Sequence, residues 1–361
     1  MKLFLCAGET SGDQRAGALL RELKLLRPDV RASAIGGPAL AAGGATILTD
    51  LTRIAPIGLV EVLGELGTYR HAMRTAADWC ARERPAAALL VDFPDFNLRL
   101  AARLKRLGIP VVYYVSPQVW AWRAGRIKEI ARVVTRMLVL FDFEEEIYRK
   151  AGVDVVWTGH PLADEIPAPA AGPRQEGLIG LLPGSRPKEA ARLMPVLAGA
   201  AGILGRTHRG SRFRFVAAPG PAVPPEAVQG FPTAPAQELM RDASLLLVAS
   251  GTATLEAALW GAPMVVVYKV SPATAVMGRM LMKLKEFSLA NILTGGGTVP
   301  ECIQSGATID KVAAEALALL DNPGRRQGMS ERLQAVRVHL GPPGASRRAA
   351  EALLGVLSSS S

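Results

Sequence analysis

Small and hydroxyl-bearing residues follow an apolar stretch in the second half of the chain, and this arrangement could bind an anion. Ser244–Ala249 carries no charge and predicts a buried parallel strand. Residues 250–256 then read Ser-Gly-Thr-Ala-Thr-Leu-Glu, with a helix predicted from Thr252. The free amides and positive dipole end of that helix would attract an anion, with hydroxyl donors from Thr252 and Thr254. Glu256 could accept from sugar hydroxyls. The alternative is an ordinary strand-to-helix connection with a Ser/Thr cap.

A second loop of the same kind lies upstream. Leu178–Leu182 is a short apolar stretch that predicts a strand, and a helix is predicted to begin near Glu189. Between them, Gly184, Ser185 and Arg186 offer backbone amides, a hydroxyl group and a guanidinium whose fork matches a phosphate. Two such units in one half of the chain favour a Rossmann-like domain whose ligand lies across the carboxyl ends of the strands.

The amino terminus has a related pattern. Lys2–Ala7 predicts a strand, residues 8–13 (Gly-Glu-Thr-Ser-Gly-Asp) a turn, and residues from about Gln14 to Leu26 a helix. The turn does not match GxGxxG, and no acidic residue follows where a ribose-binding one would lie, which argues against NAD. Its glycines let a backbone approach a ligand closely, and Glu9 and Asp13 place carboxylates beside that opening.

Two carboxylates follow the predicted strand Ala86–Val91. Asp92 comes directly after the strand and Asp95 three residues later, within Asp-Phe-Pro-Asp-Phe-Asn. Carboxylates at the end of a strand are well placed for proton transfer. The alternative is structural, with Asp95 as a helix cap and Asp92 in a hydrogen bond within the fold.

Two tryptophans lie in the polar loop that follows the predicted strand Val111–Val115. Trp120 and Trp122 are hard to explain by core packing alone. Further strands are predicted at Val133–Phe141 and Val155–Trp157. Residues 1–160 therefore alternate strand and helix, as in a parallel, doubly wound sheet.

The chain is predicted to form two domains. We expect an N-terminal domain over residues 1–166, a Pro/Ala-rich linker over 167–175, and a C-terminal domain over 176–340. The C-terminal domain would also contain strands at Phe213–Ala217 and Met264–Tyr268. A last helix, 345–357, could pack on either domain.

Composition narrows the class of partner. Among 361 residues, 42 Lys and Arg against 32 Asp and Glu give a net charge of +10, which favours an anionic partner. No basic run contains interleaved aromatic residues, which argues against nucleic acid. Three cysteines and four histidines are scattered without metal-ligand spacing, so we expect no metal site. We also expect no signal peptide and no membrane span, and hence a cytoplasmic protein.

Two amphipathic segments have two interpretations each. From Ile57 to Met73, apolar residues recur at helical spacing, and 273–287 places Met280 and its apolar neighbours opposite Arg279 and Lys283. Each segment could pack within its own domain. Each could also contact acyl chains or an anionic membrane surface.

These motifs, taken together, resemble those of the lipid-A-disaccharide synthase family. They occur in the family's order over nearly the whole chain, with only conservative departures such as Thr10 and Ala290. The matching segments are residues 7–13, 92–97, 114–123, 159–161, 182–186, 250–256, and 288–291 with 300–304.

The resemblance implies an inverting glycosyltransferase built from two Rossmann-like domains with parallel sheets facing a central cleft (GT-B). It implies transfer from UDP-2,3-diacylglucosamine to 2,3-diacylglucosamine 1-phosphate in lipid A biosynthesis, without a cofactor or metal. It also implies a peripheral location on the anionic inner face of the inner membrane, and it leaves a homodimer open. The N-terminal domain would bind the acceptor and the C-terminal domain the UDP-sugar.

The resemblance also distributes the candidate residues. Asp92 would be the general base, with Glu9 as its rival. The acceptor or its acyl chains would contact Ser11, Asn97, Trp120 and Trp122. The UDP diphosphate and nucleotide would be held by Gly184, Ser185, Arg186, Ser250, Gly251, Thr252, Glu256, Asn291, Glu301 and Gln304.

Two other classes of protein would share part of this pattern. A UDP-sugar epimerase or another glycosyltransferase would keep the nucleotide site without needing apolar surface helices. A non-catalytic nucleotide-sugar sensor would keep Arg186 and Glu256 yet tolerate the loss of Asp92. Fold analogy alone does not separate these classes.

Overall fold

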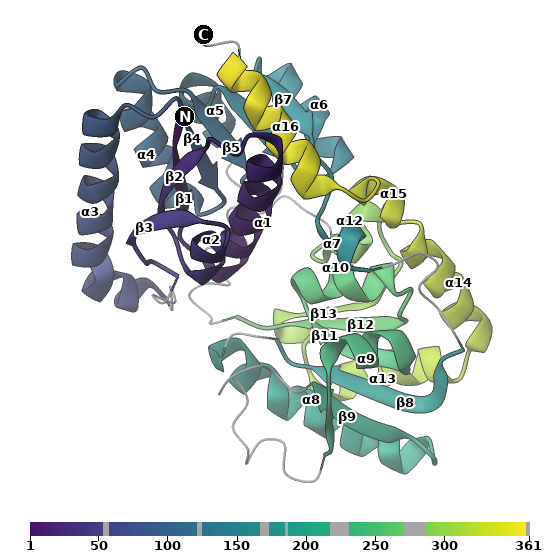
Figure 1. The fold of residues 1–361 in the computed structure, drawn as a ribbon. Coiled ribbons are helices and arrows are strands. Elements are labelled where there is room, and N and C mark those ends of the chain that lie inside the picture. Colours follow the sequence, from purple (N-terminus) through teal and green to yellow (C-terminus); the bar gives the residue numbers. More distant parts are fainter. Residues whose placement is uncertain are drawn as a thin grey trace. The chain divides into compact units, whose positions relative to one another are not determined.

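Two parallel β-sheets with flanking helices make up the computed structural model, one sheet in each of two units (Figure 1). The first unit consists of Met1–Asp164 and His339–Ser361, and the second of Glu165–Val338. The structure describes residues 1–52, 58–120, 125–166, 173–184, 187–216, 231–270 and 286–358, and only the backbone of 58–65 and 187. The predicted α/β class with two Rossmann-like sheets is confirmed.

The sheet of the first unit has seven parallel strands in the order β3-β2-β1-β4-β5-β6-β7. Its strands are β1 (Lys2–Ala7), β2 (Arg31–Ile35), β3 (Ala45–Thr49), β4 (Ala87–Val91), β5 (Val111–Tyr114), β6 (Arg136–Val139) and β7 (Val155–Trp157). The strand order reverses beside β1, which pairs with β2 on one side and with β4 on the other. Ligands of open α/β sheets bind at the carboxyl ends of the strands at such a switch point.

Helices connect these strands, and the end of the chain returns to them. The connecting helices are α1 (Thr10–Leu26), α2 (Pro38–Ala42), α3 (Gly58–Glu83), α4 (Pro94–Arg106), α5 (Arg126–Val133), α6 (Asp142–Lys150) and α7 (Leu162–Glu165). The C-terminal helices α15 (Arg337–Leu340) and α16 (Ala345–Ser358) follow the second unit, and α16 lies alongside α1 (Figure 1). Arg136 of β6 fixes α16 by donating from Nη1 to the carbonyl of Ala352 at 3.1 Å.

The sheet of the second unit has six parallel strands in the order β10-β9-β8-β11-β12-β13. These are β8 (Gln175–Leu182), β9 (Arg212–Val216), β10 (Thr233–Ala234), β11 (Ala243–Ala249), β12 (Met264–Tyr268) and β13 (Glu301–Ile303). Its helices are α8 (Pro187–Thr207), α9 (Ala236–Asp242), α10 (Thr252–Leu259), α12 (Leu289–Leu293), the short 3-10 helix η2 (Gln304–Gly306), α13 (Ile309–Leu320) and α14 (Pro323–Gln334).

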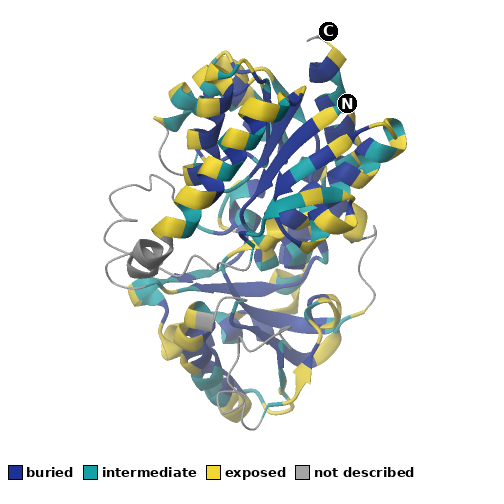
Figure 2. Ribbon diagram, turned by 60° about the vertical axis from the view of Figure 1, so that its left-hand side comes forward, coloured by how far each residue is buried: buried dark blue, intermediate teal, exposed yellow. Residues whose placement is uncertain are grey.

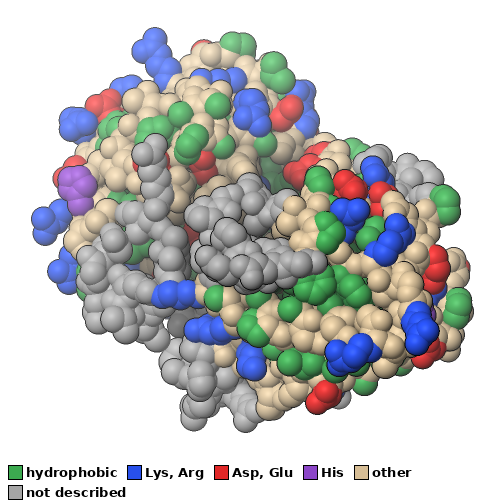
Figure 3. Space-filling view, turned by 90° about the horizontal axis from the view of Figure 1, so that it is seen from below, with side chains coloured by type: hydrophobic (Ala, Val, Ile, Leu, Met, Phe, Trp, Pro, Cys, Tyr) green, Lys and Arg blue, Asp and Glu red, His purple; other side chains and the backbone are tan. Residues whose placement is uncertain are grey.

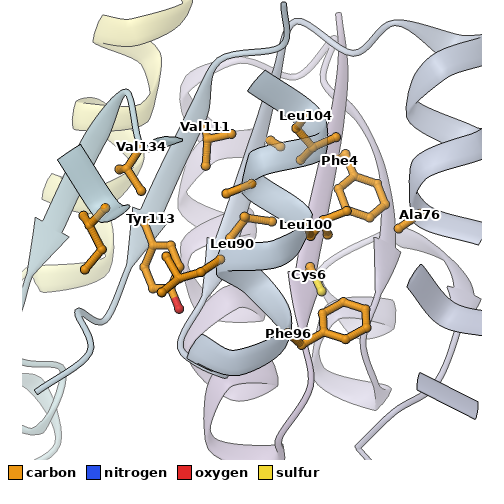
Figure 4. Close-up of a cluster of buried hydrophobic side chains, with 14 of the residues drawn as sticks. Phe4, Cys6, Ala76, Leu90, Phe96, Leu100, Leu104, Val111, Tyr113 and Val134 are labelled. Carbon is orange, nitrogen blue, oxygen red and sulfur yellow. The ribbon is translucent and has the colours of Figure 1, made fainter. Parts of the chain in front are cut away.

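Apolar strands and one face of each neighbouring helix form the core. In Figure 2 the strands are buried along most of their length, whereas the helices alternate buried and exposed residues. Figure 4 shows Phe4 and Leu90 from the first sheet packed with Leu100 and Leu104 of α4. Burying one such side chain contributes ~1.5–3 kcal/mol, so this packing holds the carboxyl ends of β1, β4 and β5 in fixed register.

Two predicted boundaries are wrong, and short strands were missed. α1 begins at Thr10, because the extended residue Glu9 serves as its N-cap and residues 10–13 already continue the helix. The predicted strand Val133–Phe141 is only four residues long, because the amphipathic helix α5 occupies the chain up to Val133. The short strands β3 and β13 were not predicted, since three to five residues carry little periodicity.

Candidate active site

The turn after β4 holds Asp92 in a strained backbone conformation. Asp92 and Phe93 both have left-handed φ values, 48° and 50°. Such values are uncommon for residues other than glycine, and strain of this kind clusters at functional sites. The Phe93 ring lies against Gly8, where an added Cβ would come 2.5 Å from Cε1 of the ring. Gly8 thus makes room for the ring that fixes the turn.

Hydrogen bonds to the backbone of Asp92 maintain this turn. The carbonyl of Asp92 accepts from Nδ2 of Asn97 at 2.8 Å and from the hydroxyl of Tyr113 at 2.6 Å. Its N–H donates to the carbonyl of Tyr114 at 2.9 Å. Nδ2 of Asn97 also donates to Val91 at 3.1 Å. The backbone of Asp92 is therefore held in place by its neighbours before any ligand arrives.

The carboxyl group of Asp92 has a raised pKa. Burial raises its pKa above the ordinary value, and the charge of Arg15 and the N–H of Phe93 partly oppose this rise. A carboxylate with a raised pKa holds a proton more strongly than an exposed one, as a general base requires. The structure places Asp92 at the carboxyl end of β4, beside the switch point of the sheet.

Asp95 has a different role from the predicted helix cap. The N-cap of α4 is Phe93, and it makes no side-chain cap hydrogen bond. Asp95 lies in the first turn of α4 and pairs with Arg126 of α5. The two neighbouring carboxylates differ in environment, because Asp92 is half-buried whereas the side chain of Asp95 is 69% exposed.

The residues after β1 differ in exposure, since Glu9 and Ser11 are accessible whereas Asp13 is buried. Ser11 is exposed on the first turn of α1, and Glu9 is half-buried as its N-cap. Asp13 does not border an opening. Its carboxylate is buried and accepts from the backbone N–H groups of Gly37 at 2.8 Å, Ala39 at 2.8 Å and Leu40 at 3.2 Å. Asp13 therefore fixes the start of α2.

Asn97 is fully buried, and its contact with the acceptor stays a prediction. Its amide supports the Asp92 turn, as described above. Within the part of the chain that the structure describes, its Oδ1 has no hydrogen-bond partner.

The loop after β5 is attached to a buried carboxylate that sequence reasoning missed. Val115, directly after β5, has a φ of 65°, which is an outlier for a β-branched residue. Oε1 of Glu144 accepts from the hydroxyl of Ser116 at 2.5 Å and from Nε1 of Trp120 at 3.3 Å. Its Oε2 accepts from the N–H groups of Leu140 and Phe141. Glu144 is the third residue after Phe141, the N-cap of α6. A glutamate at this position is part of a capping box, and this pattern could have indicated its role from the sequence.

Trp120 is half-buried, and its ring meets Phe143 edge to face at 5.3 Å. It is thus fixed in place on one side. Trp122 lies outside the described residues. Both remain candidates for contact with the acceptor.

In the second unit, three predicted nucleotide-binding segments meet at one edge of the sheet. Leu182 of β8 pairs with Val248 of β11, and Ala249 pairs with Val267 of β12. The loops that follow β8 and β11 therefore begin side by side. Gly184 has a φ of 100° and Gly251 a φ of 150°, values that favour glycine. Ser185 and Arg186 lie outside the described residues.

α10 begins directly at this edge. Ser250 is half-buried, and Gly251 and Thr252 are exposed at the start of the helix. Thr254 was predicted to add a hydroxyl donor, but this is wrong, because the buried Thr254 already donates to the carbonyl of Gly251 at 2.7 Å. Glu256 is half-buried, and its pKa is raised first by burial and then by the charge of Glu165.

Asn291 and Glu301 are brought together, but chiefly to hold each other. Nδ2 of Asn291 donates to the carbonyl of Val299 and to Glu301, each at 2.9 Å. Its Oδ1 accepts from the N–H groups of Thr298 and Val299. Glu301 also accepts from Phe287 and Ser288. A buried Asn291 with both amide ends occupied is a support for α12 rather than a free nucleotide ligand.

Gln304 follows β13 and is half-buried with a φ of 53°. Cys302 of β13 pairs with Val267 of β12, so Gln304 lies at the same edge of the sheet as Ser250. Gln304 is therefore a further non-glycine residue with a strained backbone at the carboxyl end of a strand. Across the described ranges, no group of three or more His, Cys, Asp or Glu side chains could hold a metal ion.

Comparison with known sequences decides the family. The sequence profile of lipid-A-disaccharide synthetase matches residues 3–354. A lipid-A-disaccharide synthase of Anaeromyxobacter dehalogenans is 43% identical, over 99% of this chain and 97% of that relative. One from Nitrosococcus oceani is 40% identical, over 98% and 95% of the two chains, respectively.

The chain belongs to the lipid-A-disaccharide synthase family.

Solved structures show the same fold at much lower sequence identity. A UDP-GlcNAc 2-epimerase from Neisseria meningitidis bound to UDP-GlcNAc is 15% identical, with a TM-score of 0.64 over 98% of this chain and 100% of that one. The glycotransferase of kitacinnamycin is 14% identical, with a TM-score of 0.63 over 98% of each chain. The lipid-A-disaccharide synthase family therefore shares its GT-B fold with both glycosyltransferases and epimerases.

Proposed function

We propose that this chain transfers 2,3-diacylglucosamine from UDP to 2,3-diacylglucosamine 1-phosphate, releasing UDP and a β-1,6-linked disaccharide 1-phosphate. The observation that carries this proposal is the full-length match to lipid-A-disaccharide synthases, at up to 43% identity among the relatives named above. The UDP-GlcNAc 2-epimerases with the same fold that were compared are only 12–15% identical, so the alternative of an epimerase has structural support alone.

The first unit would bind the acceptor and activate it. Asp92 takes the proton from the acceptor 6-hydroxyl while that oxygen attacks the anomeric carbon of the donor. The bond between this carbon and the diphosphate oxygen breaks, and UDP leaves with the electron pair. Attack from the face opposite the leaving group inverts the configuration. The fixed turn around Asp92 supports this role, because a base that is already oriented need not be ordered during the reaction.

The second unit would bind UDP along the edge where β8, β11 and β13 end. Gly184, Gly251 and the start of α10 leave backbone amides close to an anion, and Glu256 is within the same helix to accept from a sugar hydroxyl. Ser185 and Arg186 would complete the diphosphate site and stabilise the charge on the leaving group. Asn291 and Glu301 would support the segment that carries Gln304.

We place the enzyme on the inner face of the inner membrane, because both proposed substrates are acylated. Within the described parts of the chain, no helix is both long and apolar enough to cross a bilayer. On the face seen in Figure 3, Lys and Arg side chains are spread among acidic and hydrophobic ones. Of the first amphipathic segment, Leu66 is 37% exposed and Met73 is buried. Nearly all of the second segment, up to residue 285, lies outside the described residues.

The deciding experiment is turnover of the two acylated substrates by the purified chain, with the product followed by mass. A disaccharide 1-phosphate and one equivalent of UDP are expected. Conversion of a UDP-sugar alone to its epimer, with no disaccharide, would replace the proposal by the epimerase. Binding of UDP without either product would favour a nucleotide-sugar sensor.

A further inference from the structure

The outer side of α4 carries basic residues that the mechanism above does not use. Its inner side is buried in the core of the first unit. Four of its exposed positions hold Arg99, Arg103, Lys105 and Arg106. Arg99, Arg103 and Arg106 recur at helical spacing, so they line one side of the helix. Within the described residues none of the four side chains forms an ion pair, and only Arg106 makes a hydrogen bond, from Nε to the carbonyl of Ala102.

α5 continues this surface. It lies next to α4 on the same face of the sheet, because Leu104 of α4 and Ile130 of α5 belong to one core cluster (Figure 1). α5 adds the exposed side chains of Lys128 and Arg132. Together the two helices contain seven basic and two acidic residues, a net charge of +5. They therefore carry half of the net charge of the whole chain, which is +10.

An open groove of about 790 Å³ borders this basic surface, between α5 and α6. All of its charged side chains are basic, and Lys150 pairs with the exposed Glu146 at 2.6 Å, whereas Lys128 has no ion pair within the described residues. The other side chains of the groove are small or aliphatic, namely Ile127, Ala131, Ile147 and Ala151. Aliphatic side chains between basic ones fit a partner that is both apolar and anionic.

The composition of the surface distinguishes between anionic partners. Surfaces that bind single-stranded nucleic acid combine basic residues with aromatic ones on which bases stack. The exposed positions of the described helices α4 and α5 hold no aromatic side chain, and the groove is lined by aliphatic ones. A phospholipid offers a phosphate to Lys and Arg and an acylated glycerol to an apolar groove. The surface therefore matches an anionic lipid better than a nucleic acid.

We propose that the outer side of α4 and α5, together with the groove beside α5, docks on an anionic phospholipid bilayer. This docking surface deepens the proposed function and rests on it for one argument, the need to reach acylated substrates. α4 begins at Pro94, two residues after Asp92, and its 13 residues span about 20 Å. A bilayer that lies along α4 would therefore bring its lipids within the length of one helix of the proposed base.

The test is flotation of the full chain with vesicles. Wild type should bind vesicles made of equal parts of phosphatidylcholine and phosphatidylglycerol, should not bind phosphatidylcholine alone, and should be released as salt screens the charges. The double variant Arg99→Gln with Arg103→Gln should bind the anionic vesicles roughly 30-fold more weakly, since each basic residue near such a surface contributes roughly fivefold. Its UDP affinity should be unchanged.

The matched control removes two charges from exposed positions elsewhere in the first unit, Arg21→Gln with Arg31→Gln. It should bind the anionic vesicles as wild type does. The groove has its own variant, Ala131→Glu, which adds a carboxylate at an exposed position and should weaken vesicle binding. Leu25→Glu adds the same charge on α1, where Leu25 is 71% exposed, and should not weaken it.

Several results would overturn the docking surface. Equal binding of wild type and the double variant to the anionic vesicles is one, and an equal loss of binding in either control is another. Binding of RNA instead of vesicles, with the same dependence on Arg99 and Arg103, would assign the surface to nucleic acid. A thermal melt of each variant shows that the fold is retained.

Turnover separates failure of the surface from failure of the proposed function. With both substrates in neutral detergent micelles, the double variant should match wild type, and on anionic vesicles it should be slower. Vesicle binding that depends on Arg99 and Arg103, without a disaccharide product, would retain the surface and reject the reaction. Disaccharide synthesis at equal rates by both proteins on anionic vesicles would retain the reaction and reject the surface.

Discussion

Nδ2 of Asn97 donates to the backbone carbonyl of Asp92 at 2.8 Å and thereby ties α4 to the turn that carries the proposed base. Replacing Asn97 by Leu, which has the same branched shape but bulkier methyl groups, removes this bond and the one to Val91. We expect a loss of about 1–3 kcal/mol in the free energy of unfolding, because two buried carbonyls lose a donor. kcat should fall while the KM for the donor is kept. Chemical denaturation and steady-state kinetics check both parts. An unchanged kcat with reduced stability would limit Asn97 to folding.

Asp92→Asn should abolish the base while keeping the shape of the turn. We expect the single-turnover rate to fall by roughly 10²–10⁴-fold, the usual effect of positioned proton transfer, with UDP affinity unchanged. Asp95→Asn should have a small effect, because its ion pair with Arg126 lies at an exposed carboxylate. If Asp92→Asn turns over within a few-fold of wild type while Glu9→Gln is inactive, Glu9 is the base.

The raised pKa of Asp92 also fixes the sign of the pH dependence. The base works only when ionised, so the rate should fall as the pH drops through the pKa of the folded protein. Because burial raises that pKa, the fall should begin at a higher pH than for an exposed aspartate. A rate profile of Arg15→Gln should have its acid limb at still higher pH, since the charge of Arg15 opposes the rise.

Glu144→Gln should loosen the loop that carries Trp120. Glu144 accepts four hydrogen bonds, and a glutamine would turn one carboxylate oxygen into a donor facing other donors. We expect a loss of about 1–3 kcal/mol of stability and a higher KM for the acceptor, with the donor KM unchanged. A red shift of tryptophan emission would report the loop directly. Glu146→Gln, at an exposed neighbour on α6, is the control and should alter none of these quantities.

Glu256→Gln should stabilise the free protein while it weakens the binding of UDP. Burial and Glu165 raise the pKa of Glu256 in the folded state above that in the unfolded state. The folded state therefore binds its proton more tightly, and stability decreases as the pH rises through the folded pKa. Removing the charge should raise the melting temperature of the free protein at pH 8 and weaken UDP binding. Glu238→Gln, an exposed carboxylate of the same unit, should do neither.

The diphosphate site is predicted to work without a metal ion. Activity should survive excess EDTA, because helix dipoles and Arg186 would take the place of a cation. Arg186→Ala is the companion variant, with an expected loss of about 2–4 kcal/mol of transition-state stabilisation. If activity is lost in EDTA and restored by Mg²⁺, the diphosphate site has been misassigned.

Much of the site could be predicted from residues that follow uncharged strands. Asp92, Gly184 and Ser250 each follow such a strand, and within the second sheet the parallel pairing brings the ends of the strands before Gly184 and Ser250 to one edge. The partners of Asp13 could not be predicted, because α1 and the start of α2 meet only in the folded domain. The hydrogen bonds of Asn97 and Asn291 could likewise not be predicted, since the sequence does not show whether an amide faces a ligand or the backbone.

The return of α16 to α1 has a consequence for synthesis on the ribosome. The first unit needs residues from His339 onward, which emerge only after the whole second unit has been made. At about 5–20 residues per second, translation of residues 165–338 takes roughly 10–35 s. During this interval the apolar side of α1 that α16 later covers is open to chaperones. The second unit is therefore the first to have all of its residues, although it comes later in the sequence.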